Sequence, residues 1–157
     1  MENIRLKPFE DSDFELFSAW LSNKRVTDWF SGAGEWLNEV RQRHGAFSWR
    51  AHYIVLDGNT PFGFCQYYDC FDSKEEKYPA EKPGEMFSLD YLIGEDSYID
   101  KGYGKKIIGV LSELIKDEKK SGKIVVKPDK DNIASVKVFL SKGYVYDEQK
   151  GYYYKEL

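Results

Sequence analysis

The amino-acid sequence predicts a mixed α/β fold, in which helices flank one sheet that contains at least one parallel pair of strands. Three observations support this prediction: strand-like runs near both ends, a tight turn between two β-rich runs in the middle, and a long amphipathic helical pattern between two later strands. A strand, a crossover helix and a further strand in one sheet form a parallel pair. With 157 residues, the chain is expected to form a single domain over residues 1–157.

The first quarter of the chain reads as a strand followed by helices. Residues 4–9 alternate apolar and charged side chains, as a half-buried strand does. Asp11 or Ser12 then offers an N-cap for a helix. That helix has apolar residues at Phe14, Leu16, Phe17, Trp20 and Leu21. The pattern breaks at residues 29–34, and a short amphipathic helix is expected around residues 36–40.

The middle of the chain is expected to form an antiparallel meander. Residues 52–56 and 61–68 are rich in β-forming side chains, and residues 57–60 between them supply the Asp, Gly and Asn of a tight hairpin turn. Residues 69–84 are polar and contain two prolines, which predicts a long loop. Strand character returns at residues 86–93.

The last third of the chain alternates helices and strands. Residues 102–120 show the i, i+3, i+4 apolar stripe of an amphipathic helix, and residues 123–126 form a short buried strand after it. A further helix is expected over residues 132–143, and two final strands contain residues 144–146 and 152–154.

The composition excludes several classes of protein. With 41% hydrophobic and 17% aromatic residues the chain is globular rather than disordered. A formal net charge of -4 argues against nucleic-acid or membrane-surface binding and favours a small cationic partner. The sequence opens without a signal-like segment, and no apolar run approaches the roughly 20 residues that span a bilayer. We expect a soluble, cytoplasmic protein that is a monomer or a homodimer.

Cysteine and histidine give no indication of a metal site. Cys65 and Cys70 are the only cysteines, which is too few for a disulfide framework, and they lack clustered His or Cys partners. His44 and His52 have no carboxylate or thiol at metal-ligand spacing. We expect reduced thiols, no bound metal, and packing or surface roles for both histidines.

A glycine-containing turn precedes the helix predicted over residues 102–120. Residues 100–106 read Asp-Lys-Gly-Tyr-Gly-Lys-Lys. Glycines at a helix start let backbone N–H groups converge, and the helix dipole adds positive potential, so such a turn can bind phosphate oxygens. Two glycines at a helix start also occur for structural reasons alone. A second segment, residues 132–144, reads Asn-Ile-Ala-Ser-Val-Lys-Val-Phe-Leu-Ser-Lys-Gly-Tyr.

Together these two segments resemble the acetyl-CoA-binding core of GNAT acetyltransferases, and residues 90–144 look most like the aminoglycoside 6'-N-acetyltransferases. There, as here, an aspartate lies twelve residues before the first glycine of the turn, and an asparagine opens the later helix. The resemblance implies the GNAT fold, whose sheet is mostly antiparallel with a central parallel pair. It also implies transfer of an acetyl group from acetyl-CoA to a primary amine of a small cationic acceptor, in a ternary complex.

The resemblance further implies roles for individual residues. The acetyl-CoA site would comprise Leu92, Ile93, Lys101, Gly102, Tyr103, Gly104, Lys105, Lys106, Asn132 and Lys137. Asp90 would hold the acceptor ammonium and help remove its proton, because only a neutral amine attacks a thioester. Backbone N–H groups at residues 92–94 would stabilise the oxyanion. Trp29, Phe30 and Tyr67, with Tyr68, could supply flat walls for the acceptor.

Two residues depart from the family pattern. Phe139 stands where many GNAT enzymes have a tyrosine that protonates the leaving thiolate, so this role has no candidate. Lys127 stands where the aminoglycoside enzymes have an acidic residue, and a cation there would repel an amine. The acceptor therefore stays open between an aminoglycoside-like or polyamine-like amine and a lysine-type amine, a siderophore precursor or a protein N-terminus. A non-catalytic CoA-binding module is an alternative of another class.

Overall fold

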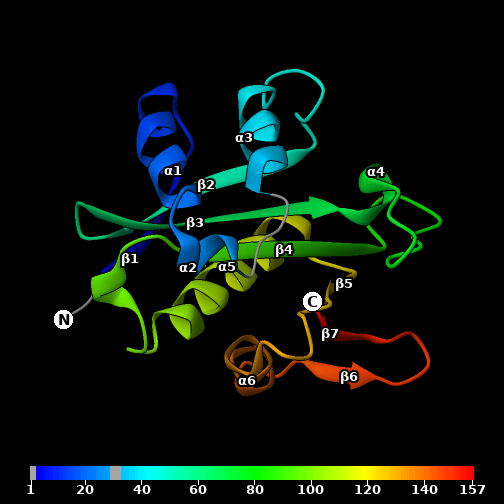
Figure 1. Ribbon diagram of the computed structural model, residues 1–157. Helices are drawn as coiled ribbons and strands as arrows, with labels where there is room; N and C mark the ends of the chain where they lie inside the picture. The colour runs from blue at the N-terminus through cyan, green and yellow to red at the C-terminus, as the bar shows by residue number, and fades with distance from the viewer. Residues whose placement is uncertain (1–2, 29–32) are drawn as a thin grey trace.

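The computed structural model describes residues 3–28 and 33–157, which form one seven-stranded sheet with helices on both faces (Figure 1). The strands are β1 (Ile4–Pro8), β2 (Arg50–Asp57), β3 (Thr60–Asp69), β4 (Met86–Ile93), β5 (Lys123–Val126), β6 (Val145–Asp147) and β7 (Tyr152–Glu156). Their order in the sheet is β1-β2-β3-β4-β5-β7-β6. Among the described strands, β4 and β5 alone pair in parallel, and the other neighbours are antiparallel. This confirms the predicted mixed fold with a central parallel pair.

Helices cover both faces of the sheet (Figure 1). They are α1 (Phe14–Leu21), α2 (Lys24–Thr27), α3 (Ala33–Arg41), α4 (Cys70–Ser73), α5 (Tyr103–Lys119) and α6 (Ile133–Ser141). One apolar cluster joins α1, α2 and α3 to one face of β2, β3 and β4, and a second joins α5 and α6 to the other face. Among the described residues, none of these helices combines the length and apolar character that crossing a membrane requires.

Three local details differ from the sequence-based expectation. Neither Asp11 nor Ser12 caps α1; a 3₁₀ turn at Asp11–Asp13 precedes it, and Asp13 accepts a hydrogen bond from the backbone N–H of Glu10 (2.9 Å). The predicted long loop contains the short helix α4, whose N-cap Asp69 accepts from the Phe71 N–H. Tyr144 lies in the core rather than in β6. Side-chain hydrogen bonds at the helix starts explain the first two differences, and burial in the core explains the third.

The central strands β4 and β5 separate after Ser88 of β4 and Val125 of β5, and this parting opens the site. Their parallel pairing covers Met86 to Ser88 only, whereas β4 continues to Ile93 alongside β3. Beyond Ser88, the β5-facing edge of β4 therefore has no strand partner in the described part of the chain. Because backbone polar groups need partners, an edge that opens inside a molecule is a place for a ligand to bind.

Candidate active site

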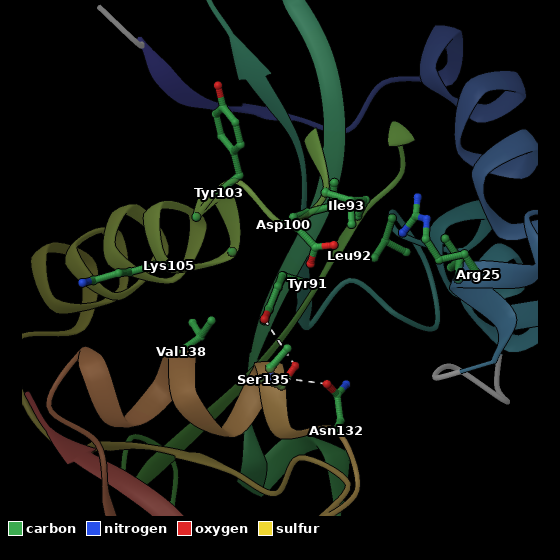
Figure 2. Close-up of a pocket in the computed structure, with 15 residues that line it drawn as sticks. Arg25, Tyr91, Leu92, Ile93, Asp100, Tyr103, Lys105, Asn132, Ser135 and Val138 are labelled. Atoms are coloured by element: carbon green, nitrogen blue, oxygen red, sulfur yellow. Dashed lines mark hydrogen bonds between the residues drawn. The ribbon is translucent and has the colours of Figure 1, made fainter. Parts of the chain in front are cut away.

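The parting of β4 and β5 leads into a pocket of about 320 Å³ between the sheet and the N-termini of α5 and α6 (Figure 2). It is lined by the end of β4, by the turn before α5, by the first turns of α6, and by Arg25 and Val26 of α2. We refer to it as the donor pocket. Leu92, Ile93 and Asn132, all assigned to cofactor binding from the sequence, line it.

Two glycines shape the start of α5 beside the donor pocket. Gly102 caps the helix with φ of +82°, a conformation that favours glycine. Gly104 is buried, and a Cβ atom there would lie 3.2 Å from the hydroxyl oxygen of Tyr91. The first N–H groups of a helix have no intrahelical acceptor. The amides of residues 102–105 therefore offer donors that need no acceptor within the helix, together with a positive helix end, which fits a diphosphate.

The lysine side chains of this region do not follow its backbone amides toward the donor pocket. Lys101 donates to the Ser97 carbonyl oxygen (2.8 Å), and the Lys105 side chain extends away from Asn132 along α5 (Figure 2). Lys106 lies 4.8 Å from the centroid of the Tyr103 ring and lines a separate surface depression. Lys137 is exposed on α6 and lines neither pocket of the site. Phosphate binding by these side chains stays a prediction.

A second pocket, of about 190 Å³, adjoins the first and contains Asp90. We refer to it as the acceptor pocket. Tyr91, Asn132 and Ser135 line both pockets, so the two meet at these three residues. Two cations, Lys77 and Lys127, and the aromatic rings of Tyr68, Tyr78 and Phe139 complete its walls. The two departures from the family pattern, Lys127 and Phe139, are therefore both part of this site.

A side chain of the neighbouring strand β3 holds Asp90 in position. Its register partner Gln66 is 1% exposed and donates from Nε2 to Oδ2 of Asp90 (3.0 Å). Burial raises the pKa of the Asp90 carboxyl, while the Gln66 hydrogen bond and the charge of Arg50 act in the opposite direction. A carboxylate with a raised pKa is a better proton acceptor than an ordinary aspartate. Gln66 was not assigned a role from the sequence, and only the strand register shows that it faces Asp90.

A buried charged network lies beside Asp90 on the same face of the sheet. Arg50 pairs with Glu39 of α3 (3.3 Å), and both side chains are almost fully buried. The Arg50 guanidinium also lies 4.4 Å from the centroid of the Tyr68 ring, whose hydroxyl donates to Glu75 (2.7 Å). This network fixes the Tyr68 wall of the acceptor pocket. Sequence reasoning missed it, because its members come from α3, β2, β3 and the segment after α4.

The sequence-based choice of Tyr67 as an acceptor contact is wrong in this structure. Tyr67 is 6% exposed on the opposite face of the sheet, where its hydroxyl donates to Glu118 of α5. Successive residues of a strand point to opposite faces, so Tyr68 lines the acceptor pocket instead. The other two acceptor residues, Trp29 and Phe30, lie outside the described residues.

The direction of the backbone N–H groups of β4 limits which of them could donate a hydrogen bond to the oxyanion. The Gly94 N–H donates to the Phe62 carbonyl oxygen (2.8 Å), so it points toward β3. Because N–H groups alternate sides along a strand, the N–H of Leu92 also points toward β3, and those of Tyr91 and Ile93 point toward the parting of β4 and β5. Ile93 therefore stays a candidate, whereas Leu92 and Gly94 do not fit this role.

Metal ligation has no geometric support in the described residues. No group of three or more His, Cys, Asp or Glu residues is arranged there to hold an ion. Cys65 and Cys70 are free, buried thiols. The described part of the site consists of hydrogen-bonding groups, the Asp90 carboxyl and the N-terminus of α5.

The parted sheet places a helix N-terminus on one side of the site and the Asp90 carboxyl on the other. The chain belongs to the GNAT acetyltransferase family, because the family model described as acetyltransferase (GNAT) domain matches residues 10–150. The aminoglycoside N(6')-acetyltransferase type 1 of Klebsiella pneumoniae is 22% identical over 149 residues, which cover 91% of this chain and 74% of that protein. The protein of the same name from Serratia marcescens matches equally well.

Solved structures support the same fold. The aminoglycoside acetyltransferase AAC(6')-Ib in complex with coenzyme A superposes with a TM-score of 0.82 at 21% identity, covering 98% of this chain and 95% of that one. Its complex with ribostamycin and coenzyme A gives the same TM-score over 98% and 93% of the two chains. An aminoglycoside N(6')acetyltransferase from Legionella pneumophila gives 0.70 at 21% identity over 98% and 91%. At these identities the likeness establishes the fold.

Proposed function

We propose that the protein transfers an acetyl group from acetyl-CoA to a primary amine of a small acceptor, by direct attack in a ternary complex. The observation that supports this most is the junction of the two pockets at Tyr91, Asn132 and Ser135. A thioester in the donor pocket and an amine at Asp90 would meet at this junction. Positioning two reactants in this way supplies much of the rate enhancement of a transferase.

The donor pocket fits coenzyme A by the chemistry of its lining. The free amides of residues 102–105 match a diphosphate, and the unpaired edge of β4 matches the amide groups of a pantetheine arm. Asn132 caps α6 by accepting from the Ser135 N–H (3.2 Å), and its side-chain amide can donate to the arm. When bound, acetyl-CoA supplies the activated acetyl group.

Asp90 provides the proton acceptor for the amine. Its carboxylate binds the ammonium group and takes one proton, which leaves a neutral nitrogen able to attack the carbonyl carbon. The Ile93 N–H, on the edge that faces the parting of β4 and β5, donates to the oxygen that becomes negatively charged. Family membership and the named relatives favour an aminoglycoside-like acceptor, and a polyamine-like amine satisfies the same chemistry.

A second candidate acceptor is a lysine-type amine that carries a carboxylate. Lys127 and Lys77 line the acceptor pocket. Lys77 lies 3.5 Å from Glu75, whereas Lys127 is exposed and makes no ion pair among the described residues. A cation in this position attracts an anionic group on the acceptor and repels a second ammonium.

The test is coenzyme A release, measured with a thiol reagent, from acetyl-CoA and a panel of aminoglycosides, polyamines, lysine-type amines and peptides with free N-termini. We expect turnover with at least one class. Asp90→Asn should lower kcat by about 100-fold, since general base catalysis contributes about this much. Asp131→Asn changes an exposed carboxylate that lines neither pocket and should retain parental kcat.

Two outcomes would contradict the proposal. Coenzyme A binding by calorimetry without transfer to any amine of the panel would favour the non-catalytic binding module. An Asp90→Asn variant as fast as the parent would remove the proton-accepting role from that carboxylate.

A further inference from the structure

One chemical step of acetyl transfer has no residue assigned to it. When the thioester C–S bond breaks, its electron pair stays on sulfur, and the thiolate gains a proton. Phe139, which stands where many GNAT enzymes have a tyrosine, has no proton to give. Its side chain is 4% exposed and lines the acceptor pocket, so this position does face the site.

Two other hydroxyl groups, those of Tyr91 and Ser135, lie close to Phe139. Side chains on a helix point back toward its N-terminus, so the tip of residue 139 lies over the turn of α6 that holds Ser135. Tyr91 reaches this turn from β4 (Figure 2): its hydroxyl oxygen is 3.3 Å from Ser135 Oγ. The Tyr91 ring meets the Phe139 ring edge-on, with the centroids 6.3 Å apart.

The hydroxyl pair is fixed in place and open to both substrates. Tyr91 and Ser135 are among the residues that line both pockets. Ser135 is held by the Asn132 cap, and the Tyr91 ring packs against Gly104, where a Cβ would come within 3.2 Å of its hydroxyl. Burial raises the pKa of the Tyr91 phenol, although the Ser135 hydrogen bond opposes this, so the phenol keeps its proton at neutral pH.

We propose that Tyr91 donates its hydroxyl proton to the leaving sulfur and that Ser135 positions this hydroxyl; the inference rests on the acetyl transfer proposed above. Asp90 accepts one ammonium proton, and the C–N bond forms as the nitrogen attacks. Tyr91 then gives its proton to sulfur as the C–S bond breaks. Solvent returns a proton to the Tyr91 oxygen through Ser135, the second amine proton leaves to solvent, and Asp90 releases the proton that it accepted, so the net release is one proton per turnover.

The first test is Tyr91→Phe, which removes one oxygen and keeps the ring. We expect kcat to fall about 10- to 100-fold, toward the low end of general acid catalysis, because a thiol of pKa about 8.5 leaves with little help. The coenzyme A Kd, measured by calorimetry, should stay within about twofold, since a proton donor acts only as the bond breaks.

A matched control comes from a similar hydroxyl pair elsewhere in the fold. Tyr144 and Ser112 are buried with their hydroxyl oxygens 3.1 Å apart, and neither residue lines the donor or acceptor pocket. Tyr144→Phe should therefore keep parental kcat. Ser135→Ala should lower kcat about threefold, because it leaves the Tyr91 proton in place but releases its orientation.

Rescue separates proton donation from packing. The double variant Tyr91→Phe with Phe139→Tyr returns a hydroxyl to the same junction and should recover most of kcat. Parental kcat in Tyr91→Phe, equal losses in Tyr91→Phe and Tyr144→Phe, or no recovery in the double variant would each overturn the donor role while the acetyl transfer stands. A parent that acetylates no amine would overturn both proposals together.

Discussion

At the scale of single residues, the buried side chain of His52 makes the stability of the fold depend on pH. Burial lowers the pKa of His52 to about 4 from 6.5, and the charges of Arg50 and Arg43 act in the same direction. At His52 the folded protein therefore binds fewer protons than the unfolded chain between these two pH values. The contribution of His52 to stability is complete above pH 6.5 and falls as the pH drops to about 4, by about 3 kcal/mol.

This dependence can be measured by urea unfolding at pH 7 and pH 5. The parent should lose stability over this interval, and His52→Gln should lose less of it, because the variant has no group to protonate at that position. His44, the other histidine of the chain, is exposed, and His44→Gln should follow the parent. Identical losses in the parent and in His52→Gln would show that His52 does not set this dependence.

We expect Lys127, which lines the acceptor pocket, to influence which amine this pocket prefers. Its charge should raise KM for polycations and lower KM for amines that carry a carboxylate, because it lines the pocket with Asp90. Lys127→Glu should reverse this order, by about tenfold in the ratio of kcat/KM values, which corresponds to about 1.4 kcal/mol. Lys130→Glu makes the same charge change in the same segment outside the pocket and should leave the ratio unchanged.

At the scale of elements, the start of α5 depends on a backbone conformation rather than on a side chain. Gly102 has φ of +82° with open space where a Cβ would stand, so Gly102→Ala costs about 1 kcal/mol of stability and tilts the amides that face the donor pocket. We expect coenzyme A to bind this variant more weakly by calorimetry. Gly58→Ala in the turn between β2 and β3, with φ of +61° and equally open space, should cost similar stability without changing binding.

The elements also show what could be predicted from the sequence. Both ends of the strand at residues 86–93 were predicted correctly, because the β-forming composition and the flanking glycines leave few alternatives to a strand of this length. The sheet face toward which each side chain of β3 points was not predictable from the sequence. Tyr67 and Tyr68 are chemically identical, and only the strand register decides which of them faces the acceptor pocket. The support of Asp90 by Gln66 could not be found for the same reason: it depends on which residues stand opposite each other.

At the scale of the whole molecule, the donor pocket exists only in the folded chain. Its walls come from α2, β4, the start of α5 and the start of α6, which are separated by up to about a hundred residues of sequence. Sequence motifs indicated the two helix starts, but the parting of β4 and β5 that joins them is a property of the complete sheet. A ligand that binds these walls therefore binds the folded state and not the unfolded one.

Such a ligand stabilises the protein by mass action. Coenzyme A at 100 times its Kd should raise the free energy of unfolding by about 2.7 kcal/mol, or the melting temperature by about 5 to 10 °C for a domain of this size. Pantetheine lacks the diphosphate and should produce a much smaller shift at the same concentration, because the amides of residues 102–105 then have no anion to bind. Equal shifts from the two compounds, measured by thermal unfolding, would mean that the affinity arises away from the glycine turn.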